Sequence, residues 1–276
     1  MTDAGVPPDV LDLFAVTAPV QALPGGQGRS VHAGDLVLSP GRDARVLDWL
    51  CPVLAPLAVR LDERPRRHSR DLRIAVPVPA RDGRWVVQGW SASRYDPGTV
   101  ACTDLAVLLA AGRVLHAELG AAVHRRPAVL DGRIDRWARA EALAWGPAAD
   151  ARAAAAGTAV LELVDRLLRA REPWQERAQL VHADLAGNVL IDARGAPVVI
   201  DVAPYWRPVL WAEAVTVLDA VLWLGAPQQE MVRWLGSGQP ARRQAMLRAA
   251  LFRVLSDEPC DVEAHLDLVP LLTWSE

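Results

Sequence analysis

Three polar side chains in the second half of the chain have the types and the spacing needed to handle a phosphate group. Asp184 and Asn188 lie four residues apart, and Asp201 follows after a short apolar stretch. Carboxylate and amide oxygens are hard ligands that suit Mg²⁺, together with water and substrate phosphates. One carboxylate of such a set can accept the proton of a hydroxyl group while a phosphoryl group is transferred to it. The pattern therefore predicts metal-assisted phosphoryl transfer.

A β-hairpin is expected to position two of these residues. Two apolar runs, residues 189–191 and 198–200, flank a turn that contains glycine. In the antiparallel register that we expect, Asn188 lies opposite Asp201 at the open end of the hairpin. Asp184 then lies on the loop that enters the first strand.

A glycine-rich segment near the N-terminus is a second candidate for phosphate binding. Gly25, Gly26 and Gly28 precede a predicted strand that ends at Ser39. Glycine has no side chain, so backbone N–H groups in such a segment can approach phosphate oxygens closely. A Pro-Gly-Gly sequence is also typical of a simple turn, and this alternative stays open.

The chain contains no lysine, because all thirty of its basic residues are Arg. Chemistry that needs an ε-amine, such as Schiff-base formation, is therefore excluded. A phosphate has to meet Arg, His, a metal ion or backbone N–H groups instead. Arg29, at the end of the glycine-rich segment, and Arg42, just after the strand that ends at Ser39, are the candidate cations.

The sequence around Asp184 resembles the aminoglycoside phosphotransferase and choline kinase superfamily. His182-x-Asp184 is similar to the His-Gly-Asp of the catalytic loop in that superfamily. The resemblance implies a protein-kinase-like fold, ATP as the phosphoryl donor and a small-molecule hydroxyl as the acceptor. It also implies that Asp184 is the catalytic Asp, with His182 beside it in the loop, and that Asn188 and Asp201 bind Mg²⁺.

A narrower resemblance covers residues 180–208, which are similar to an uncharacterised actinobacterial branch of these phosphotransferase-like proteins. Two features differ from the superfamily pattern. Asn188 follows Asp184 by four positions, where most members have five. Ser39 stands where a strand Lys would contact the α and β phosphates. Arg29 and Arg42 lie close in sequence to this strand, so we expect one of them to replace that Lys.

The chain is expected to form two lobes. The first hundred residues are rich in Gly, Pro and alternating β-branched residues, and from Thr103 onward apolar residues recur at helical spacing. We therefore predict an α+β fold with a small β-rich lobe, residues 1–96, that covers the nucleotide. A larger, mostly helical lobe, residues 97–276, then carries the catalytic loop and the acceptor site.

Three local patterns give more detailed predictions. Apolar spacing predicts a helix over residues 46–57, which Pro52 should kink or end. An Asp-Gly turn predicts a hairpin whose second strand is residues 85–87. The alanine-rich stretch 151–168 predicts one continuous helix.

Composition and charge limit the partners. The net charge is −3, so no overall field recruits nucleic acid or an anionic membrane. The N-terminus lacks the pattern of a signal peptide, and no apolar stretch is expected to reach the roughly 18 residues of a membrane span. The three cysteines are far apart and form no CxxC pair. We expect a soluble cytoplasmic protein without nucleic-acid or membrane partners, and the sequence does not predict its oligomeric state.

Two functions stay open at this stage. One is an ATP-dependent phosphotransferase that uses Mg²⁺, and the other is a non-catalytic pseudokinase that serves as a nucleotide-binding or protein-interaction module. The intact set of Asp184, Asn188 and Asp201 favours the enzyme, and Ser39 favours the pseudokinase.

Several aromatic residues leave further alternatives. Tryptophans can form a cage for a choline-like cation, although core packing is expected for most of those considered, which are Trp85, Trp90, Trp206, Trp211 and Trp223. Arg207, shortly after Asp201, either binds an anionic group or braces the catalytic loop.

Overall fold

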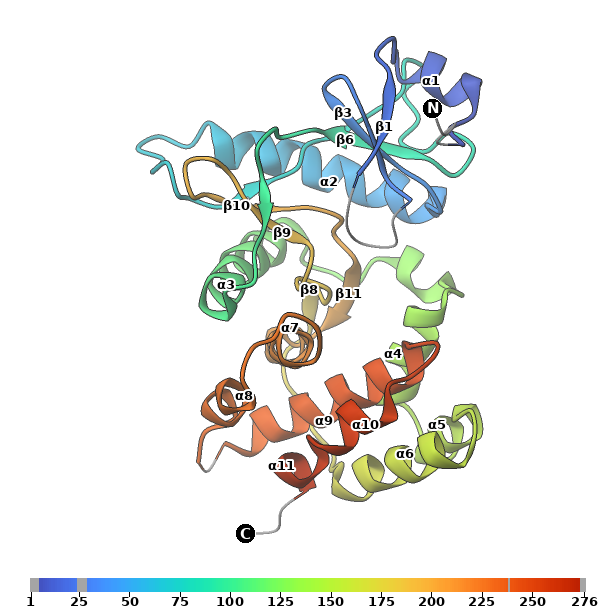
Figure 1. Cartoon of the computed structure of the whole chain (residues 1–276), viewed down its shortest axis with the longest axis vertical. Coiled ribbons are helices and arrows are strands. Elements are labelled where there is room, and N and C mark those ends of the chain that lie inside the picture. The colour runs from blue at the N-terminus through green and yellow to red at the C-terminus, as the bar shows by residue number, and fades with distance from the viewer. Residues whose placement is uncertain (1–4, 24–28, 238, 274–276) are drawn as a thin grey trace. The chain divides into compact units, whose positions relative to one another are not determined.

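The computed structural model in Figure 1 describes residues 5–23, 29–237 and 239–273. It is a mixed α+β structure, which confirms the predicted fold class. Contacts divide the chain into two compact units: residues 1–102 with 187–202, and residues 103–186 with 203–276. The segment that carries Asn188 and Asp201 therefore belongs to the first unit. The predicted roles of residues 1–96 in covering the nucleotide and of residues 97–276 in catalysis and acceptor binding stay predictions.

The first unit is built on a five-stranded sheet of antiparallel neighbours (Figure 1). Its strands, in spatial order, are β1 (Val20–Ala22), β2 (Val31–Ala33), β3 (Leu36–Ser39), β6 (Ser91–Arg94) and β5 (Pro77–Val78). The short helix α1 (Pro8–Leu13) packs its Val10 into the same core as Leu38 and Trp90. The sheet thus positions Ser39 at the end of an inner strand.

The Asp-Gly turn forms as predicted, but its partner strand is different. Gly83 has a φ of +85°, and the Ala80 N–H donates to the Arg84 carbonyl at 2.8 Å. The strand that pairs with β5 is β6, so the assignment of residues 85–87 to that strand is wrong. A second tight turn follows at Gln88 and Gly89, both with positive φ, and this turn delays the returning strand.

Helix α2 (Ala44–Asp62) begins at Asp43, whose side chain accepts from the Arg45 N–H. The helix continues through both of its prolines, so of the two predicted effects, a kink or an end, Pro52 does not cause the second. Pro52 and Pro56 are four residues apart and both exposed. The carbonyls that lose their helical N–H partners therefore lie on the solvent side, where water can satisfy them.

A second sheet in the first unit holds the predicted hairpin. Its strand order is β4 (Arg73–Ile74), β10 (Pro197–Val199), β9 (Val189–Ile191) and β7 (Val100–Ala101). The hairpin is present, but its register differs by one residue from the expectation. Asn188 lies opposite Ile200, whose N–H donates to the Asn188 carbonyl at 2.9 Å, and Asp201 lies beyond the last pair.

The hairpin loop explains the shift of register. The Asp192 N–H donates to the Ala196 carbonyl, so only three residues form the loop, and Gly195 takes a φ of +84°. A three-residue loop with glycine in the left-handed region is a favoured way to close a hairpin. Asp192 also accepts from two backbone N–H groups of the loop, at 2.8 Å each.

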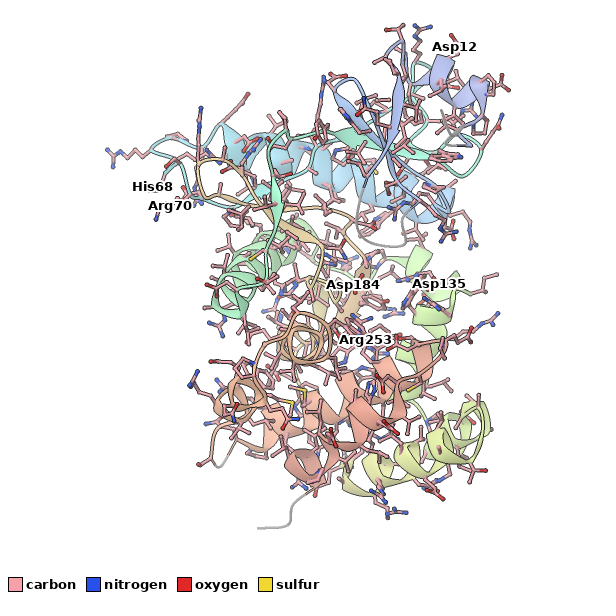
Figure 2. All side chains as sticks on the ribbon, in the orientation of Figure 1. Asp12, His68, Arg70, Asp135, Asp184 and Arg253 are labelled. Atoms are coloured by element: carbon pink, nitrogen blue, oxygen red, sulfur yellow. The ribbon has the colours of Figure 1, made fainter. Side chains whose placement is uncertain are left out.

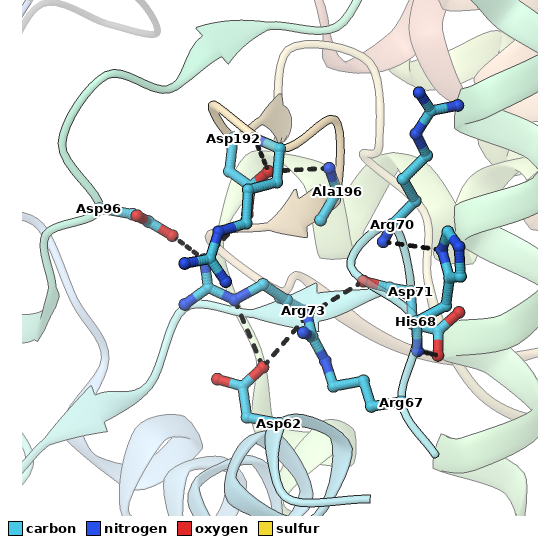
Figure 3. Close-up of polar contacts among 10 residues, drawn as sticks. Asp62, Arg67, His68, Arg70, Asp71, Arg73, Asp96, Asp192 and Ala196 are labelled. Atoms are coloured by element: carbon cyan, nitrogen blue, oxygen red, sulfur yellow. Dashed lines mark hydrogen bonds and ion pairs between the residues drawn. The ribbon is translucent and has the colours of Figure 1, made fainter.

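Arg73 connects this hairpin to the rest of the first unit (Figure 3). Its guanidinium contacts Asp62 at the end of α2 at 3.3 Å, Asp192 in the hairpin at 3.4 Å, and Asp96. Burial alone would lower the pKa of Arg73, but the carboxylates of Asp62 and Asp96 outweigh it and raise the pKa. The neighbouring segment that contains Arg67 is largely exposed.

The second unit is mostly helical and surrounds a two-stranded sheet of β8 (Gln179–His182) and β11 (Pro204–Arg207). Its core includes the fully buried Trp211, against which Tyr205 and Phe252 pack edge to face. The helices are α3 (Leu105–Ala122), η1 (Ala128–Gly132), α4 (Arg136–Trp145), α5 (Ala148–Ala154), α6 (Thr158–Ala170), α7 (Val209–Trp223), α8 (Gln228–Leu235), α9 (Pro240–Ser256), α10 (Val262–Leu266) and α11 (Val269–Thr273).

The alanine-rich stretch forms two helices, α5 and α6, and the prediction of one helix over residues 151–168 is wrong. Gly157 breaks the helix with a φ of +84°. Glycine adopts this conformation without the steric cost that other residues pay. Helix propensity of the flanking alanines therefore does not decide the local structure here.

Helix α3 is long and apolar enough to cross a membrane by length and composition. The expectation that no stretch reaches this length is therefore wrong. The contacts of α3 are those of a core helix of the second unit: Leu108, Leu115 and Leu119 are fully buried, and Arg113 forms an ion pair with Glu213 of α7.

His116 joins α3 to the end of β8. Its Nε2 accepts from the backbone N–H of His182 at 3.1 Å, and the residue is buried. Burial, with a smaller contribution from the neighbouring His182, lowers the pKa of His116 to about 4. The ring is therefore neutral at neutral pH.

We expect Arg73→Gln to lower the free energy of unfolding by about 1–3 kcal/mol, because three carboxylates lose a charged donor. Urea unfolding measures the change. Arg81→Gln is the matched control, since Arg81 and its partner Asp12 are both exposed, and it should change stability by less than about 0.5 kcal/mol. Equal effects of the two substitutions would contradict the structural role of Arg73.

We expect His116 to make stability depend on pH. Its pKa is lower in the folded chain than its ordinary value of 6.5, so the unfolded state takes up the proton first as the pH falls. Its contribution is fully present above about pH 6.5 and is lost progressively towards pH 4. Urea unfolding over this range should show a smaller loss for His116→Gln than for the wild type. Parallel curves would contradict the assignment.

Candidate functional site

The loop that carries Asp184 is fixed by buried neighbours. Ala183 and Leu185 are buried, whereas 42% of the Asp184 side chain is exposed. Leu185 packs so closely on Gly112 of α3 that a Cβ at this glycine would lie 2.7 Å from the Leu185 Cδ1. The backbone on either side is therefore held in the core, and the carboxylate between is presented to solvent.

His182 lies at the start of this loop and is fully buried. Its Nδ1 accepts from the backbone N–H of Ala203 at 3.1 Å, beside the pairing of β8 with β11. This bond joins the chain just before Asp184 to the chain just after Val202. The structure thus places His182 as an anchor of the loop.

Arg253 of α9 holds the Asp184 carboxylate. Figure 2 labels both residues. Its Nη2 donates to Asp184 Oδ1 at 2.7 Å, and its Nε donates to Oδ1 of Asp219 on α7 at 2.8 Å. Arg253 is almost completely buried and Asp219 completely. Burial raises the pKa of Asp219. Burial alone would lower the pKa of Arg253, but the carboxylates of Asp219 and Asp184 outweigh it and raise this pKa, so the guanidinium stays charged.

Sequence reasoning did not identify Arg253 or Asp219 as parts of a site. One signal was present, because Asp219 interrupts the apolar run that became α7. A carboxylate at a core position needs a partner, since an unpaired buried charge is very costly. Its partner is 34 residues away in sequence, so no local pattern could identify it.

Trp223, the last residue of α7, lies over the same guanidinium. The Cζ of Arg253 is 5.0 Å from the centroid of the Trp223 ring. The side chain is nevertheless 50% exposed. The other tryptophans considered for a cation cage differ: Trp90 and Trp211 are buried, and Trp85 and Trp206 are half-buried.

In the first unit, Asp201 follows the hairpin in a left-handed conformation, with a φ of +47°. Its Oδ1 accepts from Arg42 Nη1 at 2.5 Å. Arg42, the predicted phosphate-binding cation, is therefore paired with the predicted metal-binding carboxylate. Asn188 lies in the last pair of the same hairpin, where its carbonyl accepts from the N–H of Ile200, the residue before Asp201.

The donors in this region fit Mg²⁺ by their chemistry. Among the residues that the structure describes, no group of three or more His, Cys, Asp or Glu side chains is arranged to hold a metal ion. Mg²⁺ requires fewer protein ligands than that, because it keeps several waters and uses one or two carboxylates. Asp201 and Asn188 offer one carboxylate and one amide of this kind.

The residues predicted to bind phosphate are only partly described. Gly25, Gly26 and Gly28 lie outside the described residues. Arg29 is exposed. Ser39 is half-buried, and its Oγ lies 3.0 Å from the Oγ of Ser30 on the neighbouring segment. The hydroxyl that replaces the expected Lys thus has a local hydrogen-bond partner.

Arg207 is held by two neighbours in the second unit, and its binding of an anionic group stays a prediction. Its Nε donates to Glu141 of α4, and its guanidinium lies over the ring of Trp145, with the Cζ 4.5 Å from the ring centroid. These contacts fix β11 against α4 within the second unit.

The structure divides the predicted residues between the two units: Asp184 and His182 belong to the second, and Asn188, Asp201 and Arg42 to the first.

Comparison with known proteins gives information on the fold. No protein-family model and no curated protein matches the chain. The choline kinase LicA from Streptococcus pneumoniae is 13% identical, with a TM-score of 0.52 and coverage of 96% of each chain. An aminoglycoside phosphotransferase from Alicyclobacillus acidocaldarius is 12% identical, with a TM-score of 0.53 and coverage of 96% of this chain and 91% of that one.

A thermostable mutant of the aminoglycoside phosphotransferase APH(4)-Ia is similar over 96% of this chain and 99% of its own. It is 17% identical, with a TM-score of 0.56. These matches confirm the resemblance predicted from the sequence at the level of fold. The chain has the two-lobed α+β fold of protein-kinase-like phosphotransferases.

Proposed function

We propose that the chain is an ATP-dependent phosphotransferase that acts on a hydroxyl group of a small molecule. One observation carries the proposal: the half-exposed carboxylate of Asp184 is held by the buried guanidinium of Arg253, in a chain with the fold of small-molecule kinases. A carboxylate fixed in this way can orient a hydroxyl group and accept its proton. We also propose a cytoplasmic location, without nucleic-acid or membrane partners.

The residues of the second unit carry the proton-transfer part of this function. Asp184 accepts a hydrogen bond from the acceptor hydroxyl and takes its proton as the oxygen attacks the phosphoryl group. Arg253 donates to Asp184 Oδ1 and thereby fixes the position of this oxygen. His182 acts through the backbone as a positioning residue, because it is buried and bonded to Ala203.

Asn188 and Asp201 are the residues that would hold Mg²⁺. When bound, Mg²⁺ neutralises the negative charge of the transferred and leaving phosphates. The covalent chain alone keeps the Cα atoms of Asp184 and Asn188 within about 14 Å of each other. Once Asp201 binds Mg²⁺ instead of Arg42, the two Nη atoms of Arg42 can donate to phosphate oxygens.

A pseudokinase is the second candidate, and the ion pair of Arg42 with Asp201 favours it. A guanidinium at 2.5 Å satisfies the Asp201 carboxylate without a metal ion. Ser39 in place of a Lys removes a second charge from the nucleotide site. In this alternative the fold binds a nucleotide or another protein and transfers no phosphate.

Asp184→Asn should leave nucleotide binding unchanged and reduce turnover by a factor of about 10² to 10⁴, because the amide cannot accept a proton. The measurement is ATP-dependent phosphorylation of a panel of hydroxylated metabolites and aminoglycosides. Asp131→Asn, an exposed carboxylate of the second unit, is the matched control and should keep full turnover. Equal turnover of Asp184→Asn and the wild type would make Asp184 a loop residue, and no turnover by the wild type would favour the pseudokinase.

Asp201→Ala should abolish the Mg²⁺ dependence of ATP binding in a calorimetric titration, because the one carboxylate proposed as ligand is lost. Arg42→Ala should weaken ATP binding, as should Arg29→Ala, whereas Ser39→Ala should change it little. Unchanged affinity and metal dependence in Asp201→Ala would contradict the metal assignment. Loss of binding in Ser39→Ala alone would contradict the proposed phosphate contacts.

A further inference from the structure

An exposed aromatic ring lies beside the proposed proton acceptor. Among the tryptophans that the structure describes, only Trp223 has an exposed side chain. An indole in water leaves a broad apolar face uncovered, and such a face can pack on another molecule. A single exposed residue of this kind needs further observations to show what it binds.

The position of Trp223 is fixed rather than variable. The N–H groups of Leu224 and Ala226 both donate to the carbonyl of Ala220, at 3.1 and 3.0 Å. Gly225 between them has a φ of +74°, so the chain turns back towards the end of α7 at this residue. The backbone of Trp223 is therefore locked by the helix end, and its ring is held by the guanidinium of Arg253.

Arg253 also links the ring to the catalytic loop. Its Cζ lies 5.0 Å from the centroid of Trp223, and its Nη2 lies 2.7 Å from Asp184 Oδ1. Arg253 itself cannot move without leaving Asp219 as an unpaired buried carboxylate. The Trp223 ring and the Asp184 carboxylate are thus two exposed groups that contact the same fixed guanidinium.

We propose that Trp223 is the platform on which the acceptor alcohol lies, and that this acceptor is a neutral, ring-shaped polyhydroxy compound such as a sugar or cyclitol. This inference rests on the proposed phosphotransferase function. The axial C–H groups of such a ring give it an apolar face that packs on an indole. Its hydroxyl groups project from the rim, where one of them can reach Asp184.

Charge argues against a quaternary ammonium group on this platform. Arg253 already lies within cation–π distance of the Trp223 ring. A second cation on the same ring would share that interaction and be repelled by Arg253. A cage would also need further exposed aromatic rings, and Trp90 and Trp211 are buried. Neutral C–H groups suffer no such competition.

The experiment measures binding of glucose, myo-inositol and choline to the full chain by ligand-observed NMR, without nucleotide. Trp223→Leu keeps apolar bulk but loses the flat face, and Trp223→Phe keeps a ring. We expect glucose or myo-inositol to bind the wild type, to bind Trp223→Leu about tenfold more weakly, and to bind Trp223→Phe within about threefold of the wild type. Val232→Ala, with a similarly exposed apolar residue on α8, is the control and should bind as the wild type does.

The inference is overturned if neither ring compound binds the wild type, if Trp223→Leu binds as tightly as the wild type, or if choline binds in a way that depends on Trp223. The test separates this inference from the proposed function. Ring binding that depends on Trp223, without ATP turnover, would refute the phosphotransferase and leave a polyol-binding pseudokinase. Turnover with a KM that is the same in Trp223→Leu and the wild type would refute the platform alone.

Discussion

The second unit depends on one buried cation. Placing Arg253 in the core removes a full charge from water, and this is tolerable only because Asp219 and Asp184 accept its donors. The arrangement links α7, α9 and the loop that carries Asp184 through one planar group. Asp219 is completely buried, whereas the Asp184 side chain is partly exposed. Arg253 therefore connects a carboxylate in the core with one at the surface. The buried guanidinium thereby fixes the position of the Asp184 carboxylate, which faces solvent.

The chain has no lysine, so its buried ion pairs all use Arg, and the chemistry of the guanidinium suits this role. An ammonium group loses its proton readily when buried, whereas a guanidinium stays charged and spreads its donors over a plane. One Arg253 side chain can therefore bind two carboxylates from different elements, and Arg73 contacts three in the first unit. The ion pair of Arg42 with Asp201 repeats the same chemistry at the end of the hairpin. In all three places Arg connects segments that are distant in sequence.

The sequence allowed the element types and the order of the site residues to be predicted, because these follow from local patterns. The hairpin of residues 189–191 and 197–199 is an example. The hairpin register was missed by one residue because loop length, and not strand composition, sets it. Arg253 was missed because its contacts with Asp184 and Asp219 join segments 69 and 34 residues apart. Tertiary pairing of this kind has no signature in a single sequence.

The shifted register gives Asp201 its particular environment. Since Ile200 takes the last ladder position, Asp201 leaves the sheet and turns into the left-handed region, where a residue with a side chain loses about 1–2 kcal/mol and glycine does not. A carboxylate at such a position needs a compensating interaction, and the contact with Arg42 provides one. A metal ion with phosphate oxygens around it would provide another. The strained backbone thus holds Asp201 where two different cations can satisfy it, and which of them does so decides between the phosphotransferase and the pseudokinase.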